Sequence, residues 1–432
     1  MLCSLPWRRE MRVETRGPLA AVVRAPGSKS LTQRAILIAA LARGESRIGG
    51  ALLCEDTQYL VRALRELGVR IEEKAGELLV QGNGGELENP GRELFLGNNG
   101  TALRFLTTVL CMGLGQYKLT GTPRLCERPM GPLLDALGEL GGRVESRGAE
   151  GCAPIWVNGT GGLRGGRVRL DGSSSSQFAS SLLICAPLMN QGLELFLQGA
   201  IVSVPYLSLT AQTMRRFGVE VVQRSRRRFL VRGAQSYSAT SLEIEGDLSS
   251  ASYFLAAAAI CGGWVRVEGI NGETLQGDVR ICRILEQIGS RVTFGPNWIR
   301  VDGGPLRDGD LELDLGDAPD LVPTVAAISA VRPGRTRIAK VSHLRLKESD
   351  RLRVLKRELG KLGARVWELP DGLMLEGGGL HGGLVDPQDD HRIAMSLAVV
   401  GLRVPGVVIG NPGCVAKSYP NFWEDLRRVK GT

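Results

Sequence analysis

Residues 345–351 have the sequence Arg-Leu-Lys-Glu-Ser-Asp-Arg, which places charged side chains of both signs around a hydroxyl at the start of a helical run. A carboxylate held beside a lysine and an arginine can bind a multiply anionic substrate and exchange a proton with it. The alternative is a solvated helix start, with Ser349 as the N-cap and Asp350 favoured by the helix dipole. This segment alone does not decide between the two interpretations.

Two further polar, charged segments precede apolar runs. Residues 389–392, Asp-Asp-His-Arg, stand before the apolar residues 393–402, and residues 27–30, Gly-Ser-Lys-Ser, stand before the apolar residues 31–41. The amino end of a buried helix presents free backbone N–H groups and a positive dipole end. Three such helix starts therefore indicate a common anionic ligand.

The composition is that of a globular protein with an excess of basic residues. The chain has 432 residues, 43% of them hydrophobic, and we expect about two domains because single cores stop growing at roughly 250 to 300 residues. The net charge of +9 is compatible with nucleic-acid binding, but only residues 224–228 form a dense basic run, without interleaved aromatic residues. We interpret that run as a solvated turn and predict no nucleic-acid partner. The basic excess suits an anionic small-molecule site.

Cysteine and histidine usage indicates a reduced compartment and no catalytic metal. Nine cysteines occur without a C-x-x-C pair, and the three histidines have no metal-ligand spacing. Residues 2–9 lack the apolar core of a signal peptide, and no apolar helix candidate is long enough for a membrane span. We therefore predict a cytoplasmic protein without a membrane partner, in which Met11 is a possible alternative start.

A short string recurs along the chain roughly every 70 to 80 residues, which is typical of a repeated supersecondary unit. Each copy resembles Leu-Gly-x-Arg-Val, follows an amphipathic helix and leads into a β-rich run, so the glycine is predicted to end a helix and the Arg-Val to begin a strand. The copies occupy residues 67–71, 140–144, 217–221, 288–292 and 362–366.

A second class of helix lies between these copies. These helices are apolar nearly all round, which predicts that they are buried, and each follows a polar cluster able to cap it. They span residues 31–42, 102–112, 178–188, 251–260, 321–331 and 393–402. One repeat would thus pair a buried helix with an exposed one across short strands, and six repeats would form two domains of three.

Nine motifs occur in the order and approximate spacing that are typical of one family. They are Pro26-Gly27-Ser28-Lys29-Ser30 with Arg34, residues 96–101 with Arg104, Glu127-Arg128-Pro129, Ser174-Ser175-Ser176-Gln177, Gly246-Asp247 with residues 249–251, Pro319-Asp320, Lys347-Glu348-Ser349-Asp350-Arg351, Asp390-His391-Arg392 with residues 394–395, and residues 411–414 with Lys417. In these motifs the chain resembles 5-enolpyruvylshikimate-3-phosphate synthase, from about residue 22 to residue 423.

The resemblance implies an α/β fold of two domains, the inside-out α/β barrel of enolpyruvyl transferases, with six βαβαββ-like units, three per domain. It implies a discontinuous domain of residues 1–26 plus 246–432 and an inserted domain of residues 27–245, with the active site in the cleft between them. The chain would cross between the domains near residues 25–29 and 243–247.

The implied reaction is transfer of the enolpyruvyl group of phosphoenolpyruvate to the 5-hydroxyl of shikimate 3-phosphate, with release of phosphate and without a cofactor or metal. The resemblance assigns acid–base roles to Asp320, Glu348 and Lys29. It assigns phosphoenolpyruvate binding to Lys29, Gly100, Arg128, Gln177, Arg351, Arg392 and Lys417. It assigns shikimate 3-phosphate binding to Lys29, Ser30, Arg34, Ser175, Ser176, Gln177, Ser203, Asp320 and Lys347. His343 stands where some members have an asparagine, and we leave it out of the predicted site.

Two alternatives are weighed against this interpretation. UDP-N-acetylglucosamine enolpyruvyl transferases share the fold and the donor but use a loop cysteine several residues before the Arg-Pro pair, whereas Cys126 lies only two residues before Arg128. A non-catalytic anion- or nucleic-acid-binding protein would have no use for Asp320 and Glu348 among cations. We expect a monomer, and sensitivity to glyphosate, an inhibitor that in this family occupies the donor subsite, because Gly100 leaves room there.

Overall fold

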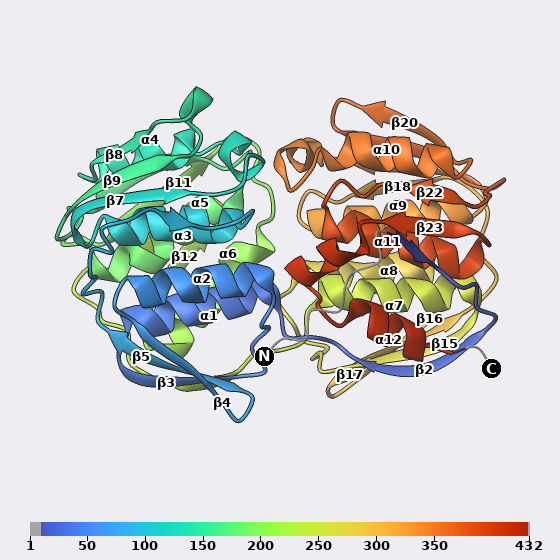
Figure 1. Ribbon diagram of the computed structural model, residues 1–432, viewed down its shortest axis with the longest axis horizontal. Helices are drawn as coiled ribbons and strands as arrows, with labels where there is room; N and C mark the ends of the chain where they lie inside the picture. The colour runs from blue at the N-terminus through green and yellow to red at the C-terminus, as the bar shows by residue number, and fades with distance from the viewer. Residues whose placement is uncertain (1–9, 431–432) are drawn as a thin grey trace. The chain divides into compact units, whose positions relative to one another are not determined.

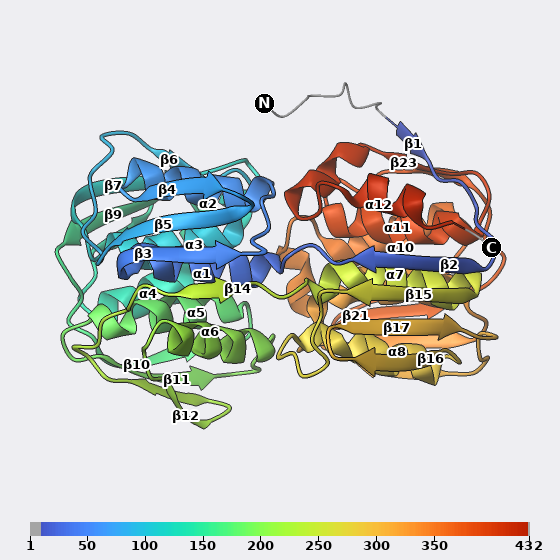
Figure 2. The same ribbon diagram turned by 90° about the horizontal axis from the view of Figure 1, so that it is seen from below.

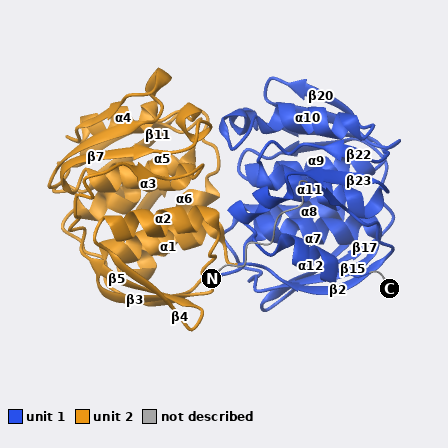
Figure 3. Ribbon diagram, viewed as in Figure 1, with its two compact units in different colours: residues 1–26, 245–432 blue, residues 27–244 orange. Residues whose placement is uncertain are grey.

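The computed structural model describes residues 10–430, so the predictions for residues 2–9 lie outside the described residues. Two compact units divide the chain: unit 1 comprises residues 1–26 and 245–432, and unit 2 comprises residues 27–244 (Figure 3). Each unit has its own hydrophobic core. The predicted division into a discontinuous domain of residues 1–26 plus 246–432 and an inserted domain of residues 27–245 stays a prediction.

One repeat of unit 2 shows the building plan. The strand β6 (Leu94–Phe95), helix α3 (Gly100–Leu110), strand β7 (Leu114–Thr120), helix α4 (Gly131–Glu139) and strands β8 (Val144–Ser146) and β9 (Ile155–Thr160) follow one another along the chain. They form a sheet of order β6-β7-β9-β8, in which the first pair is parallel and the others are antiparallel. The predicted βαβαββ unit is confirmed.

Unit 2 contains two more such repeats (Figure 1). One consists of β10 (Gly166–Asp171), α5 (Ser176–Cys185), β11 (Leu193–Gln198), α6 (Pro205–Arg216), β12 (Val222–Ser225) and β13 (Arg228–Val231). The other consists of α1 (Lys29–Leu41), β3 (Arg43–Gly49), α2 (Glu55–Glu66), β4 (Arg70–Lys74) and β5 (Glu77–Asn83), and its parallel strand β14 (Ser241–Glu243) comes from the end of the unit. The strand β14 lies beside β3 in Figure 2.

Unit 1 repeats the plan with one strand from before the insertion. The strand β2 (Leu19–Arg24) pairs in parallel with β15 (Gly263–Glu268), although unit 2 separates them in the sequence (Figure 2). That repeat continues with α7 (Leu248–Cys261), α8 (Arg280–Gln287), β16 (Arg291–Gly295) and β17 (Trp298–Gly303). The second repeat consists of β18 (Leu311–Asp314), α9 (Val322–Val331), β19 (Arg335–Ala339), α10 (Arg351–Lys361), β20 (Arg365–Leu369) and β21 (Gly372–Glu376).

The last repeat of unit 1 is shorter. It consists of β22 (Gly383–Val385), α11 (His391–Arg403), β23 (Val407–Gly410) and α12 (Phe422–Arg428), and β1 (Glu10–Arg12) adds an antiparallel strand to β23. No helix within residues 10–430 is long and apolar enough to cross a membrane.

The helices that are apolar all round form the centre of each unit, as predicted. Every residue of α7 is buried, and α7, α9 and α11 pack against one another in unit 1. The amphipathic helices instead bury one face, so that only Ile281, Cys282, Ile284 and Leu285 of α8 are buried. The amino ends of the central helices are therefore held by buried packing, which fixes the direction of the side chains that follow each cap.

The recurring glycines end helices as predicted. Each follows the C-cap residue of an amphipathic helix and has a φ between 86° and 111°, where a side chain would be strained. The five are Gly68, Gly141, Gly218, Gly289 and Gly363. The arginine begins the next strand in β4, β16 and β20, whereas β8 and β12 begin at Val144 and Val222.

Candidate active site

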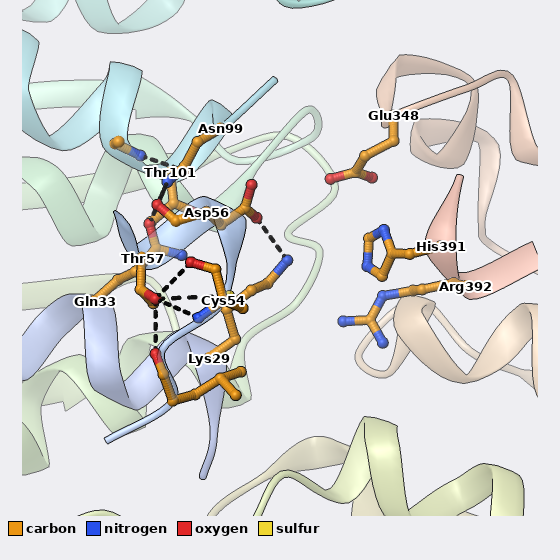
Figure 4. A network of polar contacts seen from close by, with 12 residues as sticks. Lys29, Gln33, Cys54, Asp56, Thr57, Asn99, Thr101, Glu348, His391 and Arg392 are labelled. Carbon is orange, nitrogen blue, oxygen red and sulfur yellow. Dashed lines mark hydrogen bonds and ion pairs between the residues drawn. The ribbon is translucent and has the colours of Figure 1, made fainter. Parts of the chain in front are cut away.

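The amino end of α1 in unit 2 presents a partly buried ion pair. Lys29 is the first residue of α1, and its Nζ lies 2.8 Å from Oδ2 of Asp56 in the first turn of α2 (Figure 4). The carboxylate fixes the direction of the ammonium and also suits the positive end of the α2 dipole. Asp56 was not among the predicted site residues. Its place in a first helical turn was the available signal, but the pairing with Lys29 depends on how two helices pack.

Asn99 joins the amino ends of three helices in unit 2. Its side-chain oxygen caps α3 by accepting from the Ala102 amide at 2.9 Å, and its Nδ2 donates to Oε1 of Gln33 and to the backbone carbonyl of Asp56 (Figure 4). Since Gln33 belongs to α1 and Asp56 to α2, one amide side chain holds α1, α2 and α3 in register. These hydrogen bonds hold α1, and with it Lys29, in a fixed position relative to α2 and α3.

The serine-rich segment before α5 extends this arrangement. Ser175 is the N-cap and accepts from the Gln177 amide at 3.2 Å, while Ser176 begins the helix. The side chain of Gln177 donates to Oγ1 of Thr101 at 2.8 Å and accepts from Arg104, which joins α5 to α3. Ser203 is buried just before α6 and has a positive φ of 57°.

Arg34 is buried among groups of unit 2. It donates to Oγ1 of Thr210 at 2.8 Å, to Oγ of Ser180 at 3.2 Å and to the carbonyl of Ser30 at 2.9 Å. Burial lowers its pKa to about 10, which leaves it cationic at neutral pH. The guanidinium thus holds α1 against α5 and α6, and its predicted contact with shikimate 3-phosphate stays a prediction.

Arg128 packs against the first residue of α3. It follows the short helix η1 (Leu125–Glu127), and a β-carbon at Gly100 would lie 2.6 Å from its Cζ atom. Gly100 therefore permits the close approach of this guanidinium to a helix amino end. A cation above free backbone N–H groups is a site for an anion.

Arg351 is the centre of a charge cluster in unit 1. Its side chain is 1% exposed and binds three carboxylates: Nε lies 2.8 Å from Asp390, Nη1 lies 3.0 Å from Asp320, and Nη2 lies 2.7 Å from Glu348. Burial would lower the pKa of Arg351, but these carboxylates raise it above its usual value. The structure thus brings both predicted acid–base carboxylates to one guanidinium.

Asp320 binds a second arginine of the predicted site. Nη2 of Arg392, at the start of α11, lies 2.9 Å from its Oδ2. Burial would raise the pKa of Asp320, but Arg392 and Arg351 outweigh burial and hold the pKa well below its usual range. In this arrangement Asp320 is a carboxylate that can accept a proton and cannot supply one at neutral pH.

The structure contradicts the alternative in which Ser349 is the N-cap of α10. The N-cap is Asp350, which accepts from the Arg353 amide at 3.2 Å, and Ser349 instead donates to Oδ2 of Asp390 at 3.1 Å. The hydroxyl is used in the charge cluster, where the buried Asp390 needs donors.

Side-chain capping of the central helices is likewise confirmed only in part. Asn99, Ser175, Asp247 and Asp390 cap α3, α5, α7 and α11. No side chain caps α1 or α9. Asp320 lies in the short helix η5 (Pro319–Leu321) before α9, where its carboxylate is bound by arginines instead of the helix amides.

The charges of residues 345–351 divide between two tasks. Arg345 binds Glu368 and donates to the carbonyl of Leu369 at 3.0 Å, so it attaches the segment to β20. Lys347 follows the short helix η6 (Ser342–Leu346) and acts electrostatically on Asp320 and His343.

Lys417, another residue of the predicted site, is buried at the end of the short helix η7 (Pro412–Lys417), which packs against α11.

His343, which was left out of the predicted site, is buried beside this cluster. Neither ring nitrogen has a hydrogen-bond partner among residues 10–430. Burial and the nearby Lys347 lower its pKa to about 3, although Asp320 opposes them. The imidazole is therefore neutral at physiological pH.

A family model described as EPSP synthase (3-phosphoshikimate 1-carboxyvinyltransferase) matches residues 13–426. The chain belongs to the EPSP synthase family. It is 42% identical over 425 residues to the 3-phosphoshikimate 1-carboxyvinyltransferase of Methanospirillum hungatei, covering 97% of this chain and 98% of that protein. It is 44% identical over 420 residues to the enzyme of the same name from Methanoculleus marisnigri, covering 96% and 98%.

A solved structure of EPSP synthase from Acinetobacter baumannii agrees with the fold. Its TM-score is 0.79 at 26% sequence identity, and the similarity covers 98% of each chain. The predicted family and fold class are thereby confirmed. The assignment of single residues to the two substrates is a separate matter and stays a prediction.

Proposed function

We propose that the clusters described above carry out the reaction of the EPSP synthase family in this chain. As a member of that family, the chain is an enzyme that transfers the enolpyruvyl group of phosphoenolpyruvate to the 5-hydroxyl of shikimate 3-phosphate and releases phosphate. The reaction proceeds by addition and elimination through a tetrahedral intermediate. Each stage requires one proton to be removed and another to be supplied.

The donor, phosphoenolpyruvate, carries a phosphate and a carboxylate. We assign its binding to Lys29, Gly100, Arg128, Gln177, Arg351, Arg392 and Lys417. Arginine suits both anionic groups because its fork of donors matches their pairs of oxygens. The contact between Gly100 and Arg128 supports this assignment, since it combines a guanidinium with a helix amino end.

The acceptor also carries a phosphate and a carboxylate, together with hydroxyls. We assign its binding to Lys29, Ser30, Arg34, Ser175, Ser176, Gln177, Ser203, Asp320 and Lys347. The hydroxyls of Ser175 and Ser176 lie at the start of α5, where an anionic group gains from the free amides.

We assign the proton transfers to Asp320, Glu348 and Lys29. The observation that carries this proposal is that Asp320 and Glu348 share Arg351, while Arg392 also binds Asp320. An anionic donor that recruits these guanidiniums would weaken their hold on Asp320 and so raise its proton affinity. Donor binding would thus activate the base.

The test is phosphate release from phosphoenolpyruvate, measured with and without shikimate 3-phosphate. We expect release only when the acceptor is present, and none when UDP-N-acetylglucosamine replaces it. Release with the nucleotide sugar alone would assign the chain to the related family of enolpyruvyl transferases, and no release with either acceptor would contradict the proposed activity.

We further propose that the enzyme works without a cofactor, as a monomer and in the cytoplasm. The eight cysteines at residues 10–430 are all free, and most are buried, which suits a reducing compartment. Size-exclusion chromatography with light scattering would test the monomeric state.

A further inference from the structure

Asp278 is a buried carboxyl that the proposed mechanism does not use. It lies in the short helix η4 (Gly277–Val279) of unit 1 and is 4% exposed. Its Oδ2 accepts a hydrogen bond from Oγ of Ser249, the second residue of α7. Its Oδ1 is buried and has no hydrogen-bond partner among the described residues.

Helix capping does not account for this carboxyl. The first amide of α7, that of Leu248, donates to Oε1 of Gln276 at 3.0 Å, and the amide of Ser250 donates to Asp247 at 2.8 Å. Two of the first three amides of α7 are therefore satisfied by side chains other than Asp278. Burying a carboxylate with one of its two oxygens lacking a hydrogen bond costs folding free energy. The presence of Asp278 at this place therefore needs an explanation other than helix capping.

Charged groups of three segments act on Asp278. Asp320 comes from η5, Arg392 from α11, and Asp247 from the cap of α7. The helix α7 packs against η4, η5 and α11, so these groups meet around its amino end. Burial and the charge of Asp320 raise the pKa of Asp278 to about 7, against the opposing effects of Ser249 and Arg392. A carboxyl with this pKa changes its ionisation state near neutral pH.

We propose that Asp278 is a positioning residue that controls Arg392. When Asp278 is protonated and neutral, Arg392 binds Asp320 and is available to bind the anionic donor. When Asp278 is ionised, its negative charge attracts Arg392 and repels both Asp320 and the donor, so phosphoenolpyruvate binds less well. The inference rests on the proposed role of Arg392 in donor binding.

The test is the pH dependence of KM for phosphoenolpyruvate between pH 6 and 9. In the unaltered protein, KM should rise about tenfold as pH increases through the ionisation of Asp278, the size expected for one charge acting through an interior of effective dielectric about 20. Asp278→Asn cannot ionise and should keep the low KM of acid pH throughout. Ionisation of the donor phosphate is common to all variants, so the difference between profiles isolates Asp278.

Two further variants make the test independent of how well Asp278→Asn folds. Ser249→Ala removes the hydroxyl that stabilises the ionised carboxylate, so the rise in KM should move to higher pH. Asp425→Asn is the control, because Asp425 also accepts from a hydroxyl, that of Tyr419 at 2.8 Å, and burial also raises its pKa. Its profile should match the unaltered protein.

The inference would be overturned if the rise in KM with pH (the step) were the same in Asp278→Asn as in the unaltered protein. If Asp278→Asn does not fold, a step at an unchanged pH in Ser249→Ala would overturn it. A uniform loss of kcat at every pH with the step retained would assign Asp278 a structural role only. Either result would leave phosphate release intact in the unaltered protein, so failure of this inference is distinct from failure of the proposed function.

Discussion

The carboxylates of Asp320 and Glu348 bind one guanidinium, since Nη1 and Nη2 of Arg351 lie 3.0 and 2.7 Å from them. Two carboxylates that share one cation influence each other's proton affinity. When one of them is protonated, the cation interacts more strongly with the other and stabilises its ionised form. Asp320 has Arg392 as a second cation and keeps a lowered pKa. It therefore starts each cycle ionised, and the first proton that it handles is one that it accepts.

Replacing either carboxylate by its amide should remove proton transfer while preserving shape. We expect Asp320→Asn and Glu348→Gln each to lower kcat by roughly 10² to 10⁴ without unfolding the protein. Steady-state kinetics and circular dichroism would measure the two effects. Glu312→Gln, which changes an exposed carboxylate on β18, is the control. A variant with nearly unaltered kcat would refute the role of that carboxylate.

The two arginines of the cluster should differ in their effect on stability. Arg351→Ala leaves three carboxylates in a buried place without their common partner, so the free energy of unfolding of unit 1 should fall by about 3 to 5 kcal/mol. Arg392→Ala leaves Asp320 still bound by Arg351 and should cost less stability. It should instead weaken phosphoenolpyruvate binding by roughly 2 to 5 kcal/mol.

Chemical denaturation and KM for phosphoenolpyruvate would separate these effects. Arg353→Ala is the matched control on the same helix, because that side chain is exposed and should change stability by no more than about 0.5 kcal/mol. Equal losses of stability for the changes at Arg351 and Arg392 would mean that the three-carboxylate cluster does not carry the stability assigned to it.

The fold was predictable from the sequence because its main signals are local. A glycine after an amphipathic helix, as at Gly68 and Gly363, needs only the preceding turn to explain its positive φ. A helix such as α7, apolar on every face, must be buried whatever surrounds it. The discontinuous domain, to which the pairing of β2 with β15 belongs, was implied by the family resemblance instead.

The partners of the charged residues were not predictable in the same way. Asp56 meets Lys29 because α1 and α2 pack together, and Asp278 meets Ser249 from another helix 29 residues away. Ser349 and Asp350 are both good caps, and the choice between them depended on Asp390, which competes for the hydroxyl of Ser349. Such contacts are set by tertiary packing, which no short motif encodes.

A methyl group at Gly100 should act on the donor site through Arg128. The β-carbon of Gly100→Ala would lie 2.6 Å from the Cζ atom of Arg128, so the guanidinium must move away from the helix end. We expect KM for phosphoenolpyruvate to rise roughly 10- to 100-fold, or about 1.4 to 2.7 kcal/mol. Glyphosate inhibition should weaken in parallel if it occupies the same subsite.

Stability should change little in Gly100→Ala, because the end of a long side chain can give way and alanine favours a helix by up to about 1 kcal/mol. Gly131→Ala is the matched control, since Gly131 also begins a helix but has open space where the β-carbon would go. If both changes had the same effect on KM, the explanation through Arg128 would fail.

His343 should make the stability of unit 1 depend on pH. Its pKa is about 3 in the folded protein and about 6.5 in an unfolded chain. Between these values the unfolded state binds more protons, so the stability that comes from the neutral, buried imidazole is complete above pH 6.5 and is lost as the pH falls. At pH 5 the loss should be about 2 kcal/mol relative to pH 7.5.

Chemical denaturation at both pH values would measure the free energy of unfolding. The difference in this free energy between pH 7.5 and pH 5 should be smaller by about that amount in His343→Gln than in the unaltered protein. His381→Gln, a change at an exposed histidine, should leave the difference unaltered. If the free energy of unfolding had the same pH dependence in the unaltered protein and in His343→Gln, the pKa of His343 would not be lowered by folding, and the prediction would be wrong.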